Sequence, residues 1–184
     1  MKLLAISGSL RTGSYNTTLL RAAAEVAPED VEVVVYDGLK DVPPYDEEDD
    51  TETPPAAVAA FREAIAGADA ILFATPEYNG SIPGALKNAL DWASRPFATN
   101  VLRNKPTSVV GASTGGFGAM WAQADLRRVL KTIGARVIGE EVPVPAVHTR
   151  TDEAGRLADA ETEERLREVL DALVDAVAAR QLAA

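Results

Sequence analysis

Short apolar segments alternate along this chain with longer segments in which apolar residues recur every three or four positions. The apolar segments are rich in β-branched residues, end at Gly, Ser or Pro, and are typical of strands buried on both faces. They lie at residues 3–6, 31–36, 70–74, 107–112 and 136–138, and the last could extend toward Val147. Helices are predicted at 16–26, 56–66, 84–94, 119–133 and 161–179, the first with Asn16 as N-cap. This alternation predicts an α/β fold with a parallel sheet, in a single domain spanning 1–184.

Composition excludes several classes of function. The chain has no Cys and one His, so disulfides, iron–sulfur clusters and thiolate zinc sites are excluded, and no metal site is expected. A net charge of −10 argues against nucleic-acid binding, and no apolar run is long enough to span a membrane. The short apolar N-terminus does not resemble a signal peptide. We therefore expect a cytoplasmic protein whose chemistry comes from a cofactor, with His148 at the surface.

Much of the negative charge falls in one segment, residues 46–52, between the second strand and the second helix. A run of like charges is usually a solvated loop, and we predict that this one is exposed to water.

The loop after the first strand, Gly8–Asn16, has the composition of a phosphate site. It combines the hydroxyls of Ser9, Thr12 and Ser14 with Arg11 and the start of a helix, and it contains no acidic residue. The loop matches neither the Walker A pattern nor the G-x-G-x-x-G dinucleotide pattern. One Arg and several hydroxyls suit a monophosphate, although a polar turn that caps a helix would look similar.

Two further loops follow neighbouring strands and should meet the first at the carboxyl edge of the sheet. Residues 75–84 form a tight loop with two Pro and two Gly, in which Tyr78 could border a planar heterocycle and backbone N–H groups could face its polar edge. Glu77 is expected to be solvated or paired with Lys or Arg rather than catalytic. Glycines in residues 112–118 would let a flat ligand approach the backbone. A flavin mononucleotide fits a cleft with these two ends and no acid–base pair.

The segments GSLRTGSYN (8–16) and TPEYNGSIPGALKNALDW (75–92) resemble the NADPH-dependent FMN reductase family of the flavodoxin-like superfamily, which includes quinone, chromate and azo-dye reductases. The resemblance extends to about Ile138. It implies a three-layer sandwich with strand order 2-1-3-4-5 and a homodimer or homotetramer, with the helix ending at Trp92 as a candidate dimer surface. It also implies FMN contacts at Ser9, Arg11, Ser14, Tyr15, Asn16, Pro76, Glu77, Tyr78, Asn79, Gly80, Ser113, Gly115 and Gly116.

The helix after the third loop departs from the chromate and quinone reductase branch. Trp121 stands where that branch has Arg, and Asp125 stands where His is common, so neither tetramer geometry nor a chromate preference carries over.

The resemblance implies an oxidoreductase that passes hydride from NADPH or NADH to FMN and then to a quinone-like acceptor by a ping-pong mechanism, with no catalytic side chain. A flavodoxin-like electron carrier without NAD(P)H activity is the main alternative, since an acidic protein can dock to basic redox partners. A flavin-binding sensor is a third hypothesis.

Overall fold

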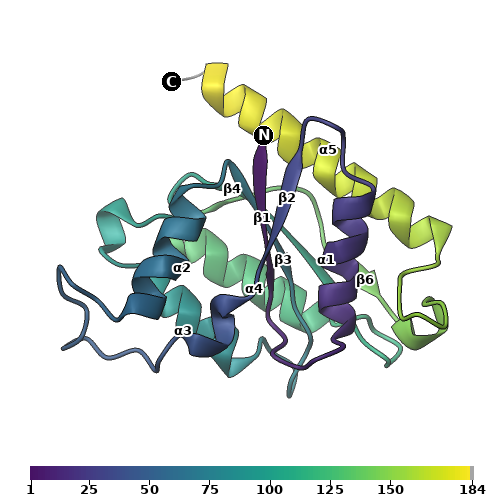
Figure 1. Cartoon of the computed structure of the whole chain (residues 1–184), viewed down its shortest axis with the longest axis horizontal. Coiled ribbons are helices and arrows are strands. Elements are labelled where there is room, and N and C mark those ends of the chain that lie inside the picture. Colours follow the sequence, from purple (N-terminus) through teal and green to yellow (C-terminus); the bar gives the residue numbers. More distant parts are fainter. Residues whose placement is uncertain (183–184) are drawn as a thin grey trace.

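A twisted parallel sheet forms the middle layer of the computed structural model, which describes residues 1–182 (Figure 1). The strand order is β2-β1-β3-β4-β5, as predicted, and a sixth strand pairs with β4. All strand pairs are parallel. The strands are β1 (Lys2–Ser7), β2 (Glu32–Tyr36), β3 (Ala70–Ala74), β4 (Pro106–Ala112), β5 (Arg136–Val137) and β6 (Val142–Val144).

Helices cover both faces of the sheet. Helices α1 and α5 pack against one face through residues such as Leu19 and Leu166, while α2, α3 and α4 pack against the other (Figure 1). β1 and β3 are buried along nearly their whole length because both faces are covered. The helices are α1 (Tyr15–Glu25), α2 (Ala56–Ala66), α3 (Gly84–Ala93), α4 (Met120–Ile133) and α5 (Ala160–Leu182), with short 3-10 helices η1 (Gly38–Asp41), η2 (Phe97–Thr99) and η3 (Val147–Thr149).

The end of the sheet differs from the predicted continuation of the last strand. β5 has only two residues, and the chain turns at Gly139, whose φ is +67°, before β6 begins. β5 pairs with the first residues of β4, and β6 pairs with the last, with Ala112 opposite Val144. Two short strands therefore share the edge of β4, because the positive φ of Gly139 interrupts the extended backbone.

The cap of α1 also differs from the prediction. Ser14, not Asn16, is the N-cap residue: its extended backbone precedes the helix, and its side chain accepts a hydrogen bond from the Asn16 N–H. Asn16 is thereby free for a different contact, which shapes the cleft described below.

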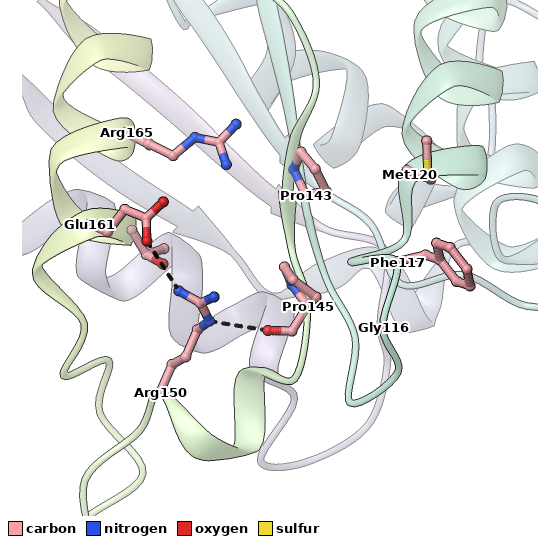
Figure 2. A pocket seen from close by; sticks show the side chains of 9 residues that line it. Gly116, Phe117, Met120, Pro143, Pro145, Arg150, Glu161 and Arg165 are labelled. Carbon is pink, nitrogen blue, oxygen red and sulfur yellow. Dashed lines mark hydrogen bonds and ion pairs between the residues drawn. The ribbon is translucent and has the colours of Figure 1, made fainter.

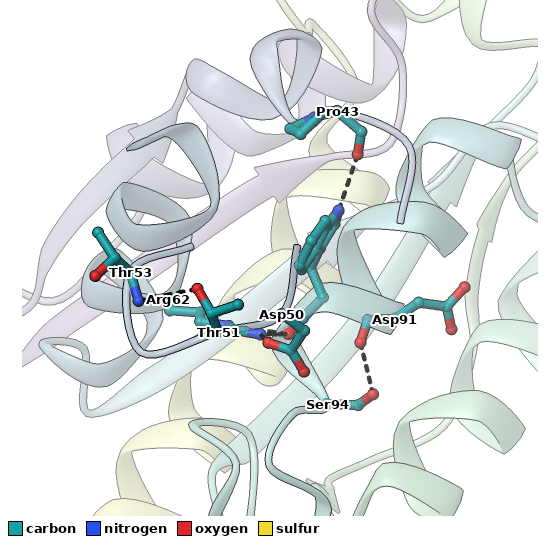
Figure 3. A network of polar contacts seen from close by, with 8 residues as sticks. Pro43, Asp50, Thr51, Thr53, Arg62, Asp91 and Ser94 are labelled. Atoms are coloured by element: carbon teal, nitrogen blue, oxygen red, sulfur yellow. Dashed lines mark hydrogen bonds and ion pairs between the residues drawn. The ribbon is translucent and has the colours of Figure 1, made fainter. Parts of the chain in front are cut away.

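The acidic segment 46–52 is mostly exposed, as predicted, but it is tied to the core at one point (Figure 3). Arg62 on α2 pairs with Asp50 at 2.8 Å, and its guanidinium also donates to the backbone oxygen of Trp92. The indole N–H of Trp92 donates to the oxygen of Pro43 at 2.9 Å. Trp92 is completely buried, so it packs in the core, and only the exposed side of α3 remains a candidate dimer surface.

No helix in residues 1–182 is both long enough and apolar enough to cross a membrane.

Candidate functional site

The three loops predicted to meet do so in an open cleft of about 230 Å³ at the carboxyl edge of the sheet. Strand register brings them together, because Ser7 lies opposite Ala74, and Ala74 lies opposite Val110. Of the predicted residues, Asn79, Gly80, Gly115 and Gly116 do not line the cleft. The lining residues are Ser9, Arg11, Ser14, Tyr15, Asn16, Pro76, Glu77, Tyr78, Ser113 and two that sequence reasoning missed, Ala112 and Thr114.

One end of the cleft is suited to an anion. Within residues 1–182 the guanidinium of Arg11 forms no ion pair, and it lies 5.7 Å from the centre of the Tyr15 ring. The backbone N–H groups of residues 11–13 also have no hydrogen-bond partner anywhere in residues 1–182. These groups lie at the N-terminus of α1, where the helix dipole also favours negative charge. The donor set therefore fits a phosphate group.

Asn16 joins two walls of the cleft. Its buried amide donates to the Ala112 oxygen at 3.2 Å and accepts from the Ala112 N–H at 3.0 Å. A short side chain thus connects the first turn of α1 to the end of β4.

The second loop presents a two-residue hairpin turn to the opposite end of the cleft. Tyr78 and Ser81 exchange backbone hydrogen bonds, and Asn79 and Gly80 form the tip with φ of +54° and +76°. Positive φ at both central residues is the backbone that an Asn-Gly pair favours. Asn79 and Gly80 therefore shape the turn, while Tyr78, half-exposed, lines the cleft.

Glu77 is half-buried and forms no ion pair with Lys or Arg within residues 1–182; one of its carboxylate oxygens bonds the backbone instead. Its Oε2 accepts a hydrogen bond from the Ala122 N–H at 3.0 Å, in the first turn of α4. The N-cap position of α4 is occupied by Ala119, which has no side-chain acceptor, so Glu77 satisfies a donor that the helix's own sequence leaves free.

The third loop is held by its own hydroxyl and by the segment that follows β6. Ser113 Oγ accepts from the Gly115 N–H, and the Gly115 oxygen accepts from the Ala146 N–H. Gly118 has φ of +57° and lies so close to β6 that a Cβ there would be 2.5 Å from the Val144 nitrogen. Only glycine fits this approach.

Gly116 lines a different pocket, which is bordered by the third loop, β6 and the start of α5 (Figure 2). Arg150 crosses that pocket, pairs with Asp159 at 2.6 Å and donates to the Pro145 oxygen. These contacts join the residues directly before α5 to the segment that follows β6. His148, in the neighbouring η3, is exposed, as predicted.

Gln123 has a structural role that sequence reasoning missed. It is completely buried on α4, donates to the Gly118 oxygen at 2.9 Å and accepts from the Val142 N–H at 2.9 Å. The sequence did contain a signal for this role, because Gln123 is a lone polar residue on the apolar face of a predicted helix.

A parallel sheet of order 2-1-3-4-5 with a phosphate-type cleft at the end of its central strands defines a flavodoxin-like α/β protein. A flavodoxin from Pseudomonas aeruginosa shares this fold, with a TM-score of 0.60 at 18% identity over 94% of this chain and 99% of that one. Residues 1–149 match the model of the NADPH-dependent FMN reductase family, and the chain belongs to that family.

Several relatives are similar over nearly their whole length. An NAD(P)H-dependent FMN reductase of Pseudomonas aeruginosa is 42% identical over 174 residues, 94% of this chain and 93% of the relative. An NADPH:quinone oxidoreductase of Arabidopsis thaliana is 40% identical over 176 residues, with coverage of 92% and 88%. Among solved structures, FerB, a flavoenzyme NAD(P)H:(acceptor) oxidoreductase from Paracoccus denitrificans, has a TM-score of 0.82 at 32% identity and covers 96% of both chains.

Proposed function

We propose that the protein is an NAD(P)H-dependent flavin oxidoreductase that holds FMN in the cleft between the three loops. One observation carries this proposal: at the start of α1, Arg11 has no ion-pair partner within residues 1–182, and the N–H groups of residues 11–13 have no hydrogen-bond partner there. Arg11, Ser9 and Ser14 would hold the phosphate end. Pro76, Glu77, Tyr78 and Ser113 would line the ring, with the loop backbone of Asn79, Gly80, Gly115 and Gly116 shaping the two rims.

Bound FMN supplies the acceptor and donor of two electrons, and the protein orients the reactants. The open cleft leaves one side accessible, where a nicotinamide from NADPH or NADH and then a quinone-like acceptor would bind in turn. Sharing one place between the two substrates gives ping-pong kinetics. The cleft needs no catalytic acid or base for hydride transfer, and the one carboxylate among its lining residues, Glu77, accepts a hydrogen bond from the Ala122 N–H through Oε2. The relatives named as quinone oxidoreductases support a quinone-like acceptor.

We further propose that the protein works in the cytoplasm as a homodimer or a dimer of dimers. Phe117 and Trp121 have ring centres 4.8 Å apart and are 62% and 49% exposed, which is a large apolar surface for a monomer to leave in water. Light scattering with size-exclusion chromatography tests the assembly.

The decisive experiment uses the purified protein. A yellow protein that releases FMN on denaturation, and that oxidises NADPH or NADH in the presence of a benzoquinone with parallel double-reciprocal plots, would support the proposal. A protein that binds FMN but does not oxidise either nicotinamide would instead be an electron carrier. A protein that takes up no FMN would overturn the proposal.

A further inference from the structure

The hairpin turn at the ring end of the cleft is attached to α4 on both sides of its tip. Before the tip, Glu77 accepts from the Ala122 N–H, and after it Ser81 Oγ donates to Asp125 Oδ2 at 2.5 Å. Ala122 and Asp125 are three positions apart in the first two turns of α4, so both contacts are made with the N-terminal part of that helix. The turn is therefore held against α4 at two points.

The side-chain contact between Ser81 and Asp125 ties the turn to α4, whereas the backbone hydrogen bonds of the turn are internal to it. Tyr78 and Ser81 bond to each other, while the N–H groups of Glu77, Asn79 and Gly80 have no partner within residues 1–182. These three N–H groups can bond the polar edge of a ring only if the turn is held in place. A shift of about 1 Å in such a turn would misalign them, because hydrogen bonds are strongly directional.

We propose that Asp125 is a positioning residue, which acts through Ser81 to hold the turn at residues 78–81 in the orientation that receives the flavin ring. The inference rests on the proposed function, since it needs FMN in the cleft. Asp125 does not line the cleft, so its effect on the flavin is indirect.

Two observations support the assignment. The hydroxyl of Ser81 and, second, the guanidinium of Arg128 lower the pKa of Asp125, which keeps the carboxylate ionised as an acceptor at neutral pH. Arg128 approaches the other carboxylate oxygen at 2.5 Å, but its side chain is 71% exposed and it does not contact the turn. On the side of its tip that follows Gly80, the turn is therefore held to α4 by one oxygen of Asp125, and the exposed ion pair with Arg128 uses the other oxygen.

The test compares Asp125→Ala, Ser81→Ala, their double variant, Asp125→Asn and Arg128→Ala. Apoprotein of each is titrated with FMN by flavin fluorescence, and the thermal unfolding of each apoprotein is recorded. Asp125→Asn retains an acceptor for the Ser81 hydroxyl, while Arg128→Ala removes the other partner of the same carboxylate and serves as the matched control.

We expect Asp125→Ala and Ser81→Ala each to raise the FMN dissociation constant about fivefold, and the double variant no further than either single variant. Asp125→Asn and Arg128→Ala should stay within about twofold of the wild type, and the melting temperatures of the apoproteins should differ little. An unchanged dissociation constant in Ser81→Ala or Asp125→Ala, or effects that multiply in the double variant, would overturn the inference. Failure of the wild type to bind FMN would instead overturn the proposed function.

Discussion

Asn16 and Ala112, 96 residues apart in the chain, are joined by two hydrogen bonds between one buried amide side chain and one backbone position. The pair connects the first loop to the third, and so fixes the width of the cleft on the side of α1. Because the amide uses both its donor and its acceptor, the contact is directional and does not depend on charge.

Replacement of Asn16 by Ala should lower the free energy of unfolding by about 1 to 3 kcal/mol, because the buried N–H and C=O of Ala112 would lose their partner. Urea denaturation of the apoprotein measures the change. Thr18→Ala, which removes an exposed hydroxyl contact to Gly155 from the same helix, is the control and should change stability by less than about 0.5 kcal/mol. Equal effects of the two substitutions would contradict a structural role for the amide.

Arg11→Ala should weaken FMN binding by about tenfold or more, because a charge-assisted contact with a phosphate is worth roughly 1.5 to 3 kcal/mol. Flavin fluorescence titration at two salt concentrations measures the loss and its electrostatic origin. Arg21→Ala removes an equal charge from the exposed side of α1, the helix that follows the Arg11 loop, and should leave the affinity near that of the wild type. If both variants bind FMN as the wild type does, the phosphate lies elsewhere.

Acid should destabilise the protein in part through Asp159, which directly precedes α5. The hydroxyl of Thr162, followed by the guanidinium of Arg150, holds the pKa of Asp159 below its ordinary value. A carboxylate whose pKa is lower in the folded state stabilises the fold above the pKa of the unfolded chain, near 4, and loses that contribution as pH falls through the folded value. Stability measured from pH 7 to pH 2 should therefore fall below about pH 4.

Asp159→Ala should reduce stability by about 1 kcal/mol at neutral pH, since Asp159 also caps α5 by accepting from the Thr162 N–H. The difference from the wild type should shrink as pH falls below about 4, because the wild-type carboxylate is then neutral. A difference that stays constant from pH 7 to pH 2 would show that the charge of Asp159 contributes nothing.

Gly118→Ala should destabilise the protein by more than about 2 kcal/mol, because the new Cβ would meet the Val144 backbone at 2.5 Å and φ there is positive. Gly84→Ala provides the contrast, since nothing lies within 4 Å of its Cβ position and the residue is helical. That substitution should be neutral or stabilising by up to about 1 kcal/mol. Thermal unfolding of the two variants side by side checks both expectations, and equal melting temperatures would refute the close approach.

The periodicity of apolar residues was sufficient to predict the layers of the fold. Helix α2 and strand β3 have the predicted bounds, because their apolar spacing and the residues that flank them are local properties. The break between β5 and β6 was not predicted, because it depends on how β4 pairs along its length rather than on the composition of residues 136–144. In the sequence, Gly139 is compatible both with one continuous strand and with two short strands separated by a turn.

For the cleft, too, some features could be predicted from the sequence and others could not. Sequence by itself determined that Arg11, the hydroxyls and the tight loop of residues 75–84 follow β1 and β3 and would meet the loop after β4, since parallel strands place their carboxyl ends at one edge. Only the tertiary structure decided the partners of three polar side chains: Asn16 bonds Ala112, Glu77 bonds the Ala122 N–H, and Asp125 bonds Ser81. The physical reason is that a buried polar group must find a hydrogen-bond partner, and which partner is within reach depends on chain segments far apart in sequence.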